Sequence, residues 1–455
     1  MKSYVSTLRQ VLATLTITLS VFMAGTFFGW PSPVTQMMKH SIIPPINMTS
    51  SQESWMVTAI EIGNLIFPLP AGFLMDTFGR RLCLMASGPL ALAGWALVVF
   101  TKDVRCLYVA RILHGCSMAI AFVISPVYVG EIAGNKIRGS LSVFFQGMNI
   151  MGLLLVYAVG WCSSYNTLAL SMSVVPVLLT VSLFFIPESP YYLVMAGDKK
   201  GAAESLSWLR ATDIAGVEEE VRVMSSSESN MSGSPKDLLK RSGKPLAIVL
   251  VVGTSLIFSG ISVIEAYAST AFGDSSDFSI TADACAVMLG VVAMLGVAFS
   301  ATVVDRFGRR PVLLLSCTGL ALSNLVSAYG LYHVHMEWLV LVALGATMFC
   351  GNAGLMPLAT TILCEYFPTT DRALANGITQ FVVTIASLLS LKIYQPVSDM
   401  YGMHANFLLF AADAAFSAIV VYMFVPETKG KSFEEIEMLF KKKKPKAVRN
   451  RAGKV

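Results

Sequence analysis

Three short charged motifs each occur twice in the sequence, in the same order and about 230 residues apart. The copies are DTFGRR at 76–81 and DRFGRR at 305–310, a glutamate seven residues before an arginine at 131 and at 365, and PESP at 187–190 and PETK at 426–429. Three motifs repeated at a nearly constant offset predict two homologous halves, each with its own acids and arginines.

The chemistry of these motifs is reversible ion pairing. Opposite charges at the edge of a low-dielectric layer attract strongly, and each costs desolvation when it is left single. Pairs that form and break as two halves rock make a gate. Anchoring of helix ends explains the arginines alone, but it does not explain acids at matching positions in both halves. The predicted gate residues are Asp76, Arg80, Arg81, Glu131, Arg138, Glu188, Asp305, Arg309, Arg310, Glu365, Arg372 and Glu427.

A second kind of candidate is an acid inside an apolar run. Glu265 is such an acid, and an intramembrane acid is costly and suggests a function by default. It could bind a substrate hydroxyl, carry a proton or pair with a cation, or it could be a structural acid bonded to a neighbouring helix. Glu61 and Asp413 are weaker cases, and we expect His114 to be a packed histidine. No nucleophile–base pair, metal spacing or nucleotide loop is visible, so we expect no enzyme activity, cofactor or metal site.

The elements that position these residues must be membrane helices. The 455 residues are 55% hydrophobic and only 13% charged, about half the charged fraction usual in soluble domains. A disordered chain, a coiled coil, a disulfide scaffold and an ordinary cytosolic enzyme are therefore excluded. A spanning helix needs about 20 apolar residues. Twelve apolar runs lie at about 11–30, 54–75, 83–101, 106–126, 141–161, 167–186, 246–268, 284–304, 312–331, 338–363, 373–395 and 404–425.

The polar segment between the sixth and seventh runs divides the chain. We therefore predict an all-α membrane protein with twelve transmembrane helices in two pseudo-symmetric six-helix bundles. The predicted parts are an N-terminal bundle at 1–190, a cytoplasmic linker with short helices at 191–245, a C-terminal bundle at 246–430 and a basic cytoplasmic tail at 431–455.

The distribution of basic residues predicts the orientation. With both termini in the cytoplasm, 28 of the 33 Lys and Arg residues fall on the inner side. The first run is too long for a signal peptide, so we expect it to be a span. The loop after it carries Asn47-Met48-Thr49, a glycosylation sequon on the outer side. The net charge is +5, and the basic residues are scattered between the apolar runs, so we expect no nucleic-acid partner. The expected environment is the bilayer, and a monomer is plausible.

These motifs resemble those of the sugar porter family of the major facilitator superfamily, over residues 25–435. The matching residues are Gly72, Asp76, Gly79, Arg80 and Arg81; Arg111, Gly115, Pro126, Tyr128, Glu131, Arg138 and Gly139; PESP at 187–190, with Tyr191 where Arg is expected; and the complete PETKG at 426–430. The spacing is most similar to the insect trehalose and glucose facilitators. The resemblance implies two bundles that rock about a central site, which is alternating access.

The resemblance also implies where the substrate would bind. Gln146 matches the family's sugar-contacting glutamine, and the candidate substrate contacts are Gln146, Asn149, Ser262, Glu265, Tyr267, Thr360 and Thr384. Other family contacts are replaced, because a glutamine pair is Leu256-Ile257 here and Pro-Trp is Ala359-Thr360. The gate motifs are thus intact, while the expected sugar cage is thinned.

Three functions remain open. The first is facilitated transport of trehalose, a hexose or a related polyol across the plasma membrane. The second is a carrier of a non-sugar solute or a proton symporter; symport is disfavoured because Phe27 stands where proton-coupled relatives carry Asp. The third is a non-transporting sugar receptor, which the short C-terminal tail disfavours.

Overall fold

The computed structural model describes residues 2–40, 46–133, 138–228, 235–268, 281–333, 337–367, 369–429, 431 and 433–440. Helices account for nearly all of these residues, and no strand occurs among them. Within these described ranges, eleven helical segments are long and apolar enough to cross a membrane, and a bent pair makes a twelfth candidate. The predicted all-α fold is therefore confirmed.

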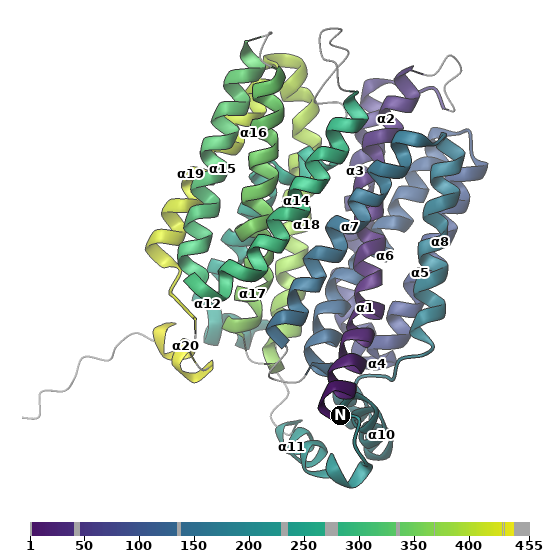
Figure 1. The fold of residues 1–455 in the computed structure, drawn as a ribbon, viewed down its shortest axis with the longest axis vertical. Coiled ribbons are helices and arrows are strands. Elements are labelled where there is room, and N and C mark those ends of the chain that lie inside the picture. Colours follow the sequence, from purple (N-terminus) through teal and green to yellow (C-terminus); the bar gives the residue numbers. More distant parts are fainter. Residues whose placement is uncertain are drawn as a thin grey trace, which may run out of the picture.

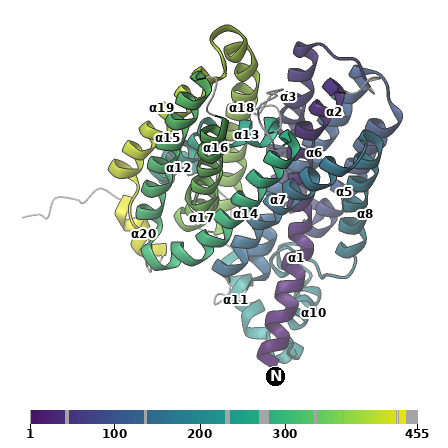
Figure 2. The same ribbon diagram turned by 45° about the horizontal axis from the view of Figure 1, so that its top comes forward.

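The first half of the chain supplies the spans of one bundle (Figures 1 and 2). Its helices are α1 (Lys2–Gly29), α2 (Pro31–His40), α3 (Ser50–Ile66), α4 (Pro68–Phe78), α5 (Arg80–Phe100), α6 (Val104–Ile132), α7 (Arg138–Cys162) and α8 (Tyr165–Leu183). The linker forms α9 (Pro190–Met195), α10 (Lys199–Arg210), the 3-10 turn η1 (Ile214–Gly216) and α11 (Glu218–Glu228).

The second half supplies the other bundle, which lies beside the first in Figure 2. Its helices are α12 (Pro235–Phe258), α13 (Ile261–Tyr267), α14 (Ala282–Phe307), α15 (Arg309–Tyr332), α16 (Glu337–Cys350), the wide turn η3 (Gly351–Leu355), α17 (Met356–Tyr366), α18 (Thr369–Tyr401), α19 (Met403–Phe424) and α20 (Phe433–Phe440). Helix α12 begins before the boundary predicted at 246 and bends at Ser242 (φ −127°, ψ 27°).

Three of the predicted spans are broken rather than continuous. The second span bends by 53° between α3 and α4, where Pro68 and Pro70 remove backbone donors. The seventh breaks at Gly260, whose φ of +89° favours glycine. The tenth contains the wide turn η3, and such turns are frequent at functional sites. Irregular backbone at membrane depth must lie inside protein or line a water-filled cavity. The breaks at Gly260 and at η3 are buried, whereas Ile66 and Pro70 at the first break are exposed.

Glycines allow the helices of the N-terminal half to approach closely. A Cβ on Gly63 of α3 would lie 2.0 Å from the Ile112 carbonyl oxygen of α6, and a Cβ on Gly115 would lie 1.9 Å from the Ile60 carbonyl oxygen. In lipid there is no hydrophobic driving force between helices. Small residues at such crossings instead allow the close van der Waals packing that holds the helices together. The family motif residue Gly115 is therefore explained by packing.

The outer surface of the bundles is strongly apolar. On α8, Leu170, Val174 and Leu178 are each more than half exposed, and on α15 so are Leu315 and Leu322. A soluble monomer rarely exposes apolar patches on this scale. These faces of α8 and α15 therefore fit the hydrocarbon of a bilayer.

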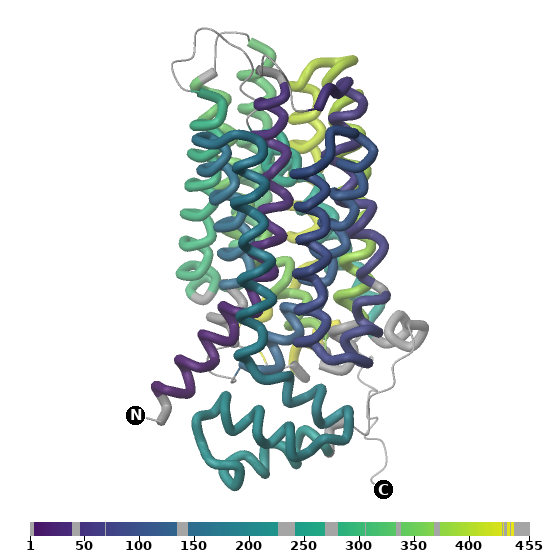
Figure 3. The backbone as a smooth tube through the Cα atoms, turned by 90° about the vertical axis from the view of Figure 1, so that its right-hand side faces the viewer, coloured from purple at the N-terminus to yellow at the C-terminus, as the bar shows by residue number. Residues whose placement is uncertain are grey.

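The linker helices lie beneath the bundles, at the end where α1 begins (Figure 3); we call this end the linker side. Their small core includes Val194, Leu206 and Val221. The first turns of α1 bind the end of α10, because Arg9 Nη1 donates to the Trp208 carbonyl (2.9 Å) and Ser6 Oγ donates to the Leu209 carbonyl (3.1 Å). Carbonyls at a helix end have no intrahelical partner, so these bonds fix the linker to the N-terminal half.

Replacing Gly63 with Val should separate α3 from α6. We expect the free energy of unfolding to fall by about 1–3 kcal/mol, the usual cost of overpacking a well-packed site. Thermal unfolding of the purified protein in detergent measures the change. Gly345→Ala in α16 is the control, because a Cβ there meets nothing within 4 Å. Equal melting temperatures for the two variants would contradict the close approach.

Candidate functional site

The first cluster of predicted gate charges lies at the linker side of the N-terminal half. Arg80 Nη2 lies 3.1 Å from Asp76 Oδ1 and 3.1 Å from Glu131 Oε1. Its Nη1 donates to the Met75 carbonyl at 3.0 Å. Arg80 is only 4% exposed, so two acids and a carbonyl replace the water that its guanidinium loses.

Glu188 closes this cluster from the end of the sixth span. Its carboxylate accepts backbone N–H groups of Arg80 (3.1 Å), Arg81 (3.1 Å) and Ser189 (2.8 Å). Free N–H groups at a helix start attract a carboxylate, and Arg80 begins α5. Gly79 (φ +93°) makes the turn, and a Cβ there would lie 2.5 Å from Glu188 Oε2. The glycine of the motif is thus required by conformation and by space.

The C-terminal half repeats this arrangement. Arg309 Nε lies 3.0 Å from Glu365 Oε1, and the Glu427 carboxylate accepts the N–H groups of Arg309 (3.0 Å) and Arg310 (3.1 Å). The hydroxyl of Thr428 donates to Glu365, as Ser189 does to Glu131. The predicted internal repeat therefore extends to individual hydrogen bonds.

The two capping glutamates differ in their electrostatics. Burial raises the pKa of Glu188 above its ordinary value, because its backbone hydrogen bonds offset that cost only in part. Burial also acts to raise the pKa of Glu427, but four backbone N–H groups outweigh it and lower the pKa. These donors belong to Lys429, Arg309, Arg310 and Thr428.

Each described ion pair of these clusters lies within one half. The sequence suggested pairs that join the halves and break as they rock. Instead, Arg80 and Arg309 each bind acids of their own half, because those acids lie on adjacent helices of the same bundle. The side chains of Arg138, Asp305 and Arg372 lie outside the described part of the structure. In the described part, the clusters hold each half together as a unit.

The central candidate site contains an amide pair that joins the halves. Gln146 of α7 donates through Nε2 to Oδ1 of Asn352, at 3.1 Å. Asn352 lies in the wide turn η3 and is fully buried. Asn149, one turn from Gln146, is buried with its side-chain oxygen unbonded by the described residues. Two amides that can reorient are suited to binding hydroxyl groups in pairs.

Helix α13 carries three of the candidate contacts, and all are buried: Ser262, Glu265 and Tyr267. The phenol of Tyr157 in α7 donates to the backbone carbonyl of Glu265, which links α13 to the opposite half. Tyr267 stacks on Tyr394 of α18, with ring centroids 5.1 Å apart. The short helix is thus held by partners on both sides.

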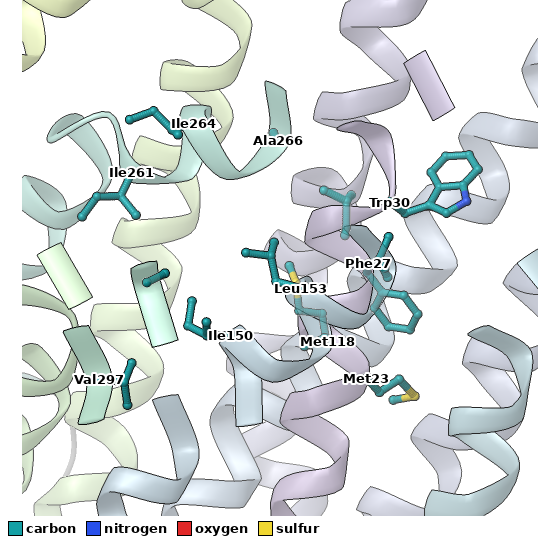
Figure 4. Packing of buried hydrophobic residues seen from close by; sticks show 14 of the residues in the cluster. Met23, Phe27, Trp30, Met118, Ile150, Leu153, Ile261, Ile264, Ala266 and Val297 are labelled. Carbon is teal, nitrogen blue, oxygen red and sulfur yellow. The ribbon is translucent and has the colours of Figure 1, made fainter. Parts of the chain in front are cut away.

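Buried apolar side chains surround this region (Figure 4). Ile150 and Leu153 of α7 lie between Phe27 of α1 and Ile261 and Ile264 of α13 in that view. All five are in one continuous buried cluster. The polar candidates Gln146 and Asn149 therefore lie on a helix whose neighbouring residues Ile150 and Leu153 are apolar and buried.

Two candidate contacts have different surroundings. Thr360 is exposed on α17, and its hydroxyl donates to the Pro357 carbonyl at 2.9 Å. Thr384 is buried in the contact between α18 and α3, where it accepts a hydrogen bond from Asn64 at 3.0 Å. Its own hydroxyl donates to the Gln380 carbonyl at 2.8 Å. Thr384, a predicted substrate contact, thus has hydrogen-bond partners in the contact between these two helices.

Asn64 and Thr384 belong to a polar seam between α3 and α18, one helix from each half. Glu61 accepts hydrogen bonds from Ser387 of α18 (2.8 Å) and from Asn64 of its own helix (3.0 Å). All four side chains are buried. Further along, Lys392 of α18 lies 4.1 Å from the ring centroid of Trp55 in α3. Glu61 therefore has a described role in joining the halves.

Arg111 is buried nearby and is held by backbone oxygens. Its Nη1 donates to the Phe27 carbonyl (2.8 Å) and its Nε to the Met56 carbonyl (3.2 Å). The ring of Phe27 stacks on His114, with centroids 4.3 Å apart. An aromatic stack thus fills the place where a first-span acid would stand. His114 is packed, as predicted.

Several residues of this region were missed by the sequence analysis. Asn352, Asn64 and Tyr157 form the contacts just described, and each is a polar residue inside an apolar run. Acids inside apolar runs were noted in the sequence, whereas among amides only Gln146 and Asn149 were named, through the family resemblance. Because a buried amide also needs partners, the same search extended to Asn and Gln would have found Asn352 and Asn64.

Solved structures share this architecture. One is the partially occluded inward-open xylose transporter XylE from E. coli, with a TM-score of 0.80 and 21% identity over 93% of this chain and 99% of that chain. Another is the proton:xylose symporter XylE bound to 6-bromo-6-deoxy-D-glucose, with a TM-score of 0.79 and 22% identity over 94% of this chain and 99% of that one. The fold is the major facilitator fold.

The chain belongs to the family "Sugar (and other) transporter", whose profile matches residues 6–440. Among curated proteins, it is 27% identical to the facilitated trehalose transporter Tret1 of Culex quinquefasciatus, over 95% of this chain and 86% of that protein. It is 29% identical to human solute carrier family 2, facilitated glucose transporter member 6, over 95% of this chain and 91% of that protein.

The two capping glutamates should respond to pH in opposite directions. The lowered pKa of Glu427 contributes stability above its ordinary value near 4.5, and this is lost as the pH falls through its folded pKa. The raised pKa of Glu188 lowers stability once that carboxyl ionises, and the penalty disappears as the pH falls. Melting temperatures of Glu188→Gln and Glu427→Gln, each minus wild type, should therefore change in opposite directions between pH 3 and pH 7. The Glu427 difference should fall with rising pH below about 4.5, and the Glu188 difference should rise with pH above that value. Parallel slopes would show that the two caps are electrostatically alike.

Ser387→Ala should weaken the polar seam. It leaves Glu61 Oε1 without its donor from α18, and an unsatisfied buried acceptor costs about 1–3 kcal/mol. Chemical unfolding in detergent measures this loss. Ser390→Ala on the same helix is the matched control, because no described hydrogen bond involves its buried hydroxyl. A Ser387 variant no less stable than the Ser390 variant would exclude a bond to Glu61.

Proposed function

We propose that the chain carries a sugar, or a closely related polyol, across the membrane by facilitated alternating access. The observation that carries this proposal is the hydrogen bond between Gln146 of one half and Asn352 of the other. The family assignment and the names of the relatives, which are facilitated trehalose and glucose transporters, support it.

The amide pair suggests how a sugar is bound. Gln146 and Asn352 lie on the two bundles, and Gln146 Nε2 donates to Asn352 Oδ1 at 3.1 Å. A sugar between them would replace one amide–amide bond with several hydroxyl–amide bonds. Asn149, Ser262, Glu265 and Tyr267 are the further proposed contacts, and Thr360 is proposed on the resemblance alone. Because the contacts come from both halves, bound substrate would draw the bundles together.

The charge clusters support the mechanical part of the proposal. Arg80 with Glu131, and Arg309 with Glu365, tie neighbouring helices inside each bundle. A bundle tied in this way moves as one body, and rocking then breaks only bonds between bundles. Arg138, Asp305 and Arg372 remain proposed as gate residues between the halves.

The surroundings of Arg111 favour facilitation over proton coupling. In proton-coupled relatives an acid faces this region from the first span, whereas here Phe27 stacks on His114 and offers only its backbone carbonyl to Arg111. A carbonyl takes up no proton in this pH range. Among the described contacts, α1 therefore offers Arg111 a backbone oxygen and no carboxylate.

A carrier of a less hydroxylated solute is the second candidate. It is favoured by Leu256 and Ile257, which stand where the family carries two sugar-binding glutamines. Such a site offers fewer donors and acceptors to hydroxyl groups. The amide pair and the three polar residues of α13 weigh against this candidate.

The proposed orientation places the linker side in the cytoplasm and the chain in the plasma membrane. The first described helix, α1, begins on the linker side, and the last described helix, α20, lies on that side too (Figure 1). Asn47 is exposed just before α3, at the opposite end of the molecule. We therefore place Asn47 outside, where it can accept a glycan. Thr49, the third residue of this sequon, caps α3 through its side chain. Glycosylation of Asn47 would therefore precede the folding of this turn.

Purified protein in liposomes should take up labelled glucose or trehalose to equilibrium, and an imposed proton gradient should not raise the final level. Gln146→Ala should lower uptake about 10-fold or more, because it removes the amide that joins substrate and bundle. Asp413→Asn in α19 serves as the control, since Asp413 lies outside the proposed site. Absence of uptake for every sugar would exclude the proposal, and accumulation driven by the proton gradient would favour symport.

A further inference from the structure

Glu265 stands out among the buried charged side chains because its partner is absent from the described protein. The side chain is 3% exposed, and its Oε1 accepts no hydrogen bond from the described residues. Glu61, the other deeply buried intramembrane acid, accepts bonds from Ser387 and Asn64. A buried carboxyl group without a hydrogen-bond partner is costly, so a role in packing alone does not explain it.

No described cation is placed to neutralise Glu265. Helix α13 packs against α1, α2, α12, α16 and α18. Of the described cationic side chains on these helices, Arg9 binds the linker, Lys392 lies over Trp55, and Lys244 is exposed near the opposite end of α12. The described salt bridges likewise do not include Glu265.

The backbone around Glu265 is held so that its side chain keeps its position. Gly260 breaks the seventh span and starts α13 in a new direction. The Tyr157 hydroxyl donates to the Glu265 carbonyl from the opposite half. Two residues on, Tyr267 stacks on Tyr394. A backbone held at these three points, where α13 contacts both bundles, limits where the carboxyl group can lie and so favours a ligand that binds between the bundles.

We infer that Glu265 is the specificity-determining acceptor of this transporter, and that it binds two adjacent hydroxyl groups of the sugar. This inference rests on the proposed function. A carboxylate has two oxygens that accept side by side, which matches the spacing of neighbouring ring hydroxyls. One acid thereby compensates for the amides that Leu256 and Ile257 have replaced.

The inference predicts which substrates are rejected. A site built to bond a hydroxyl strongly rejects the analogue without it, because the site's buried polar group is then left unpaired. A sugar that lacks either hydroxyl of the bound pair would leave Glu265 partly unsatisfied. Sugars altered elsewhere on the ring would bind as before.

The test pairs substrate changes with protein changes in liposomes. Uptake efficiency is measured for D-glucose, trehalose and the 2-, 3-, 4- and 6-deoxy analogues of glucose, in wild type and in Glu265→Ala. For wild type we expect losses of about 10- to 100-fold for analogues lacking one of two adjacent hydroxyls. In Glu265→Ala, glucose should fall by a similar factor, and those same analogues should fall no further. Asp413→Asn should keep the wild-type ranking.

Stability measurements separate this role from a structural one. Because Glu265 lacks a described partner for Oε1, Glu265→Gln should melt at the same temperature as wild type or higher, while losing discrimination between the analogues. A marked fall in melting temperature would identify a structural acid and overturn the inference. So would an equal loss of uptake for glucose and every deoxy analogue. Failure of the wild type to transport any sugar would instead refute the proposed function.

Discussion

Desolvation of charge is the constraint on which the rest of this structure depends. A charged group taken out of water is stable only beside a partner that replaces the water. Arg80 and Arg309 meet this condition with acids from adjacent helices, and Glu61 meets it with Ser387 and Asn64. Each such bond fixes one helix to another. The chain carries few charges. The buried ones bond particular helices to each other, and those helices therefore move together.

The bonds that join the halves differ from those inside them. Within each half, ion pairs and carboxylate caps dominate. Between halves, the polar seam of α3 and α18 runs through Glu61 and Asn64, while the centre holds the neutral pair of Gln146 and Asn352. A neutral amide pair is easier to break than a buried ion pair, because neither partner is left charged. The central amide contact between the bundles is thus easier to break than the ion pairs inside them, whereas the bond from Ser387 to Glu61 joins the bundles through a buried acid.

The sequence predicted the parts of this structure that are encoded locally. The paired motifs announced the two charge clusters because their acids and arginines lie in short segments at span ends. The breaks at Pro68 and Gly260 were visible as residues but not as bends, since proline and glycine also occur in continuous spans. The partner of Thr384 was not predictable, because it depends on the rotation of α18 against α3. For the same reason the sequence showed Glu265 to be unusual without showing that its Oε1 is unpaired.

The attachment of the linker also has a mechanical meaning. Arg9 and Ser6 of α1 bind the last carbonyls of α10, and Arg210 of α10 donates to the Ile132 carbonyl at the end of α6. All three bonds reach the N-terminal bundle. The linker helices are therefore attached to that bundle and would move with it. Because they extend beyond the span ends, they would be displaced further than the spans themselves. A ligand that binds the linker helices from the aqueous phase would therefore slow the transport cycle without contacting the sugar.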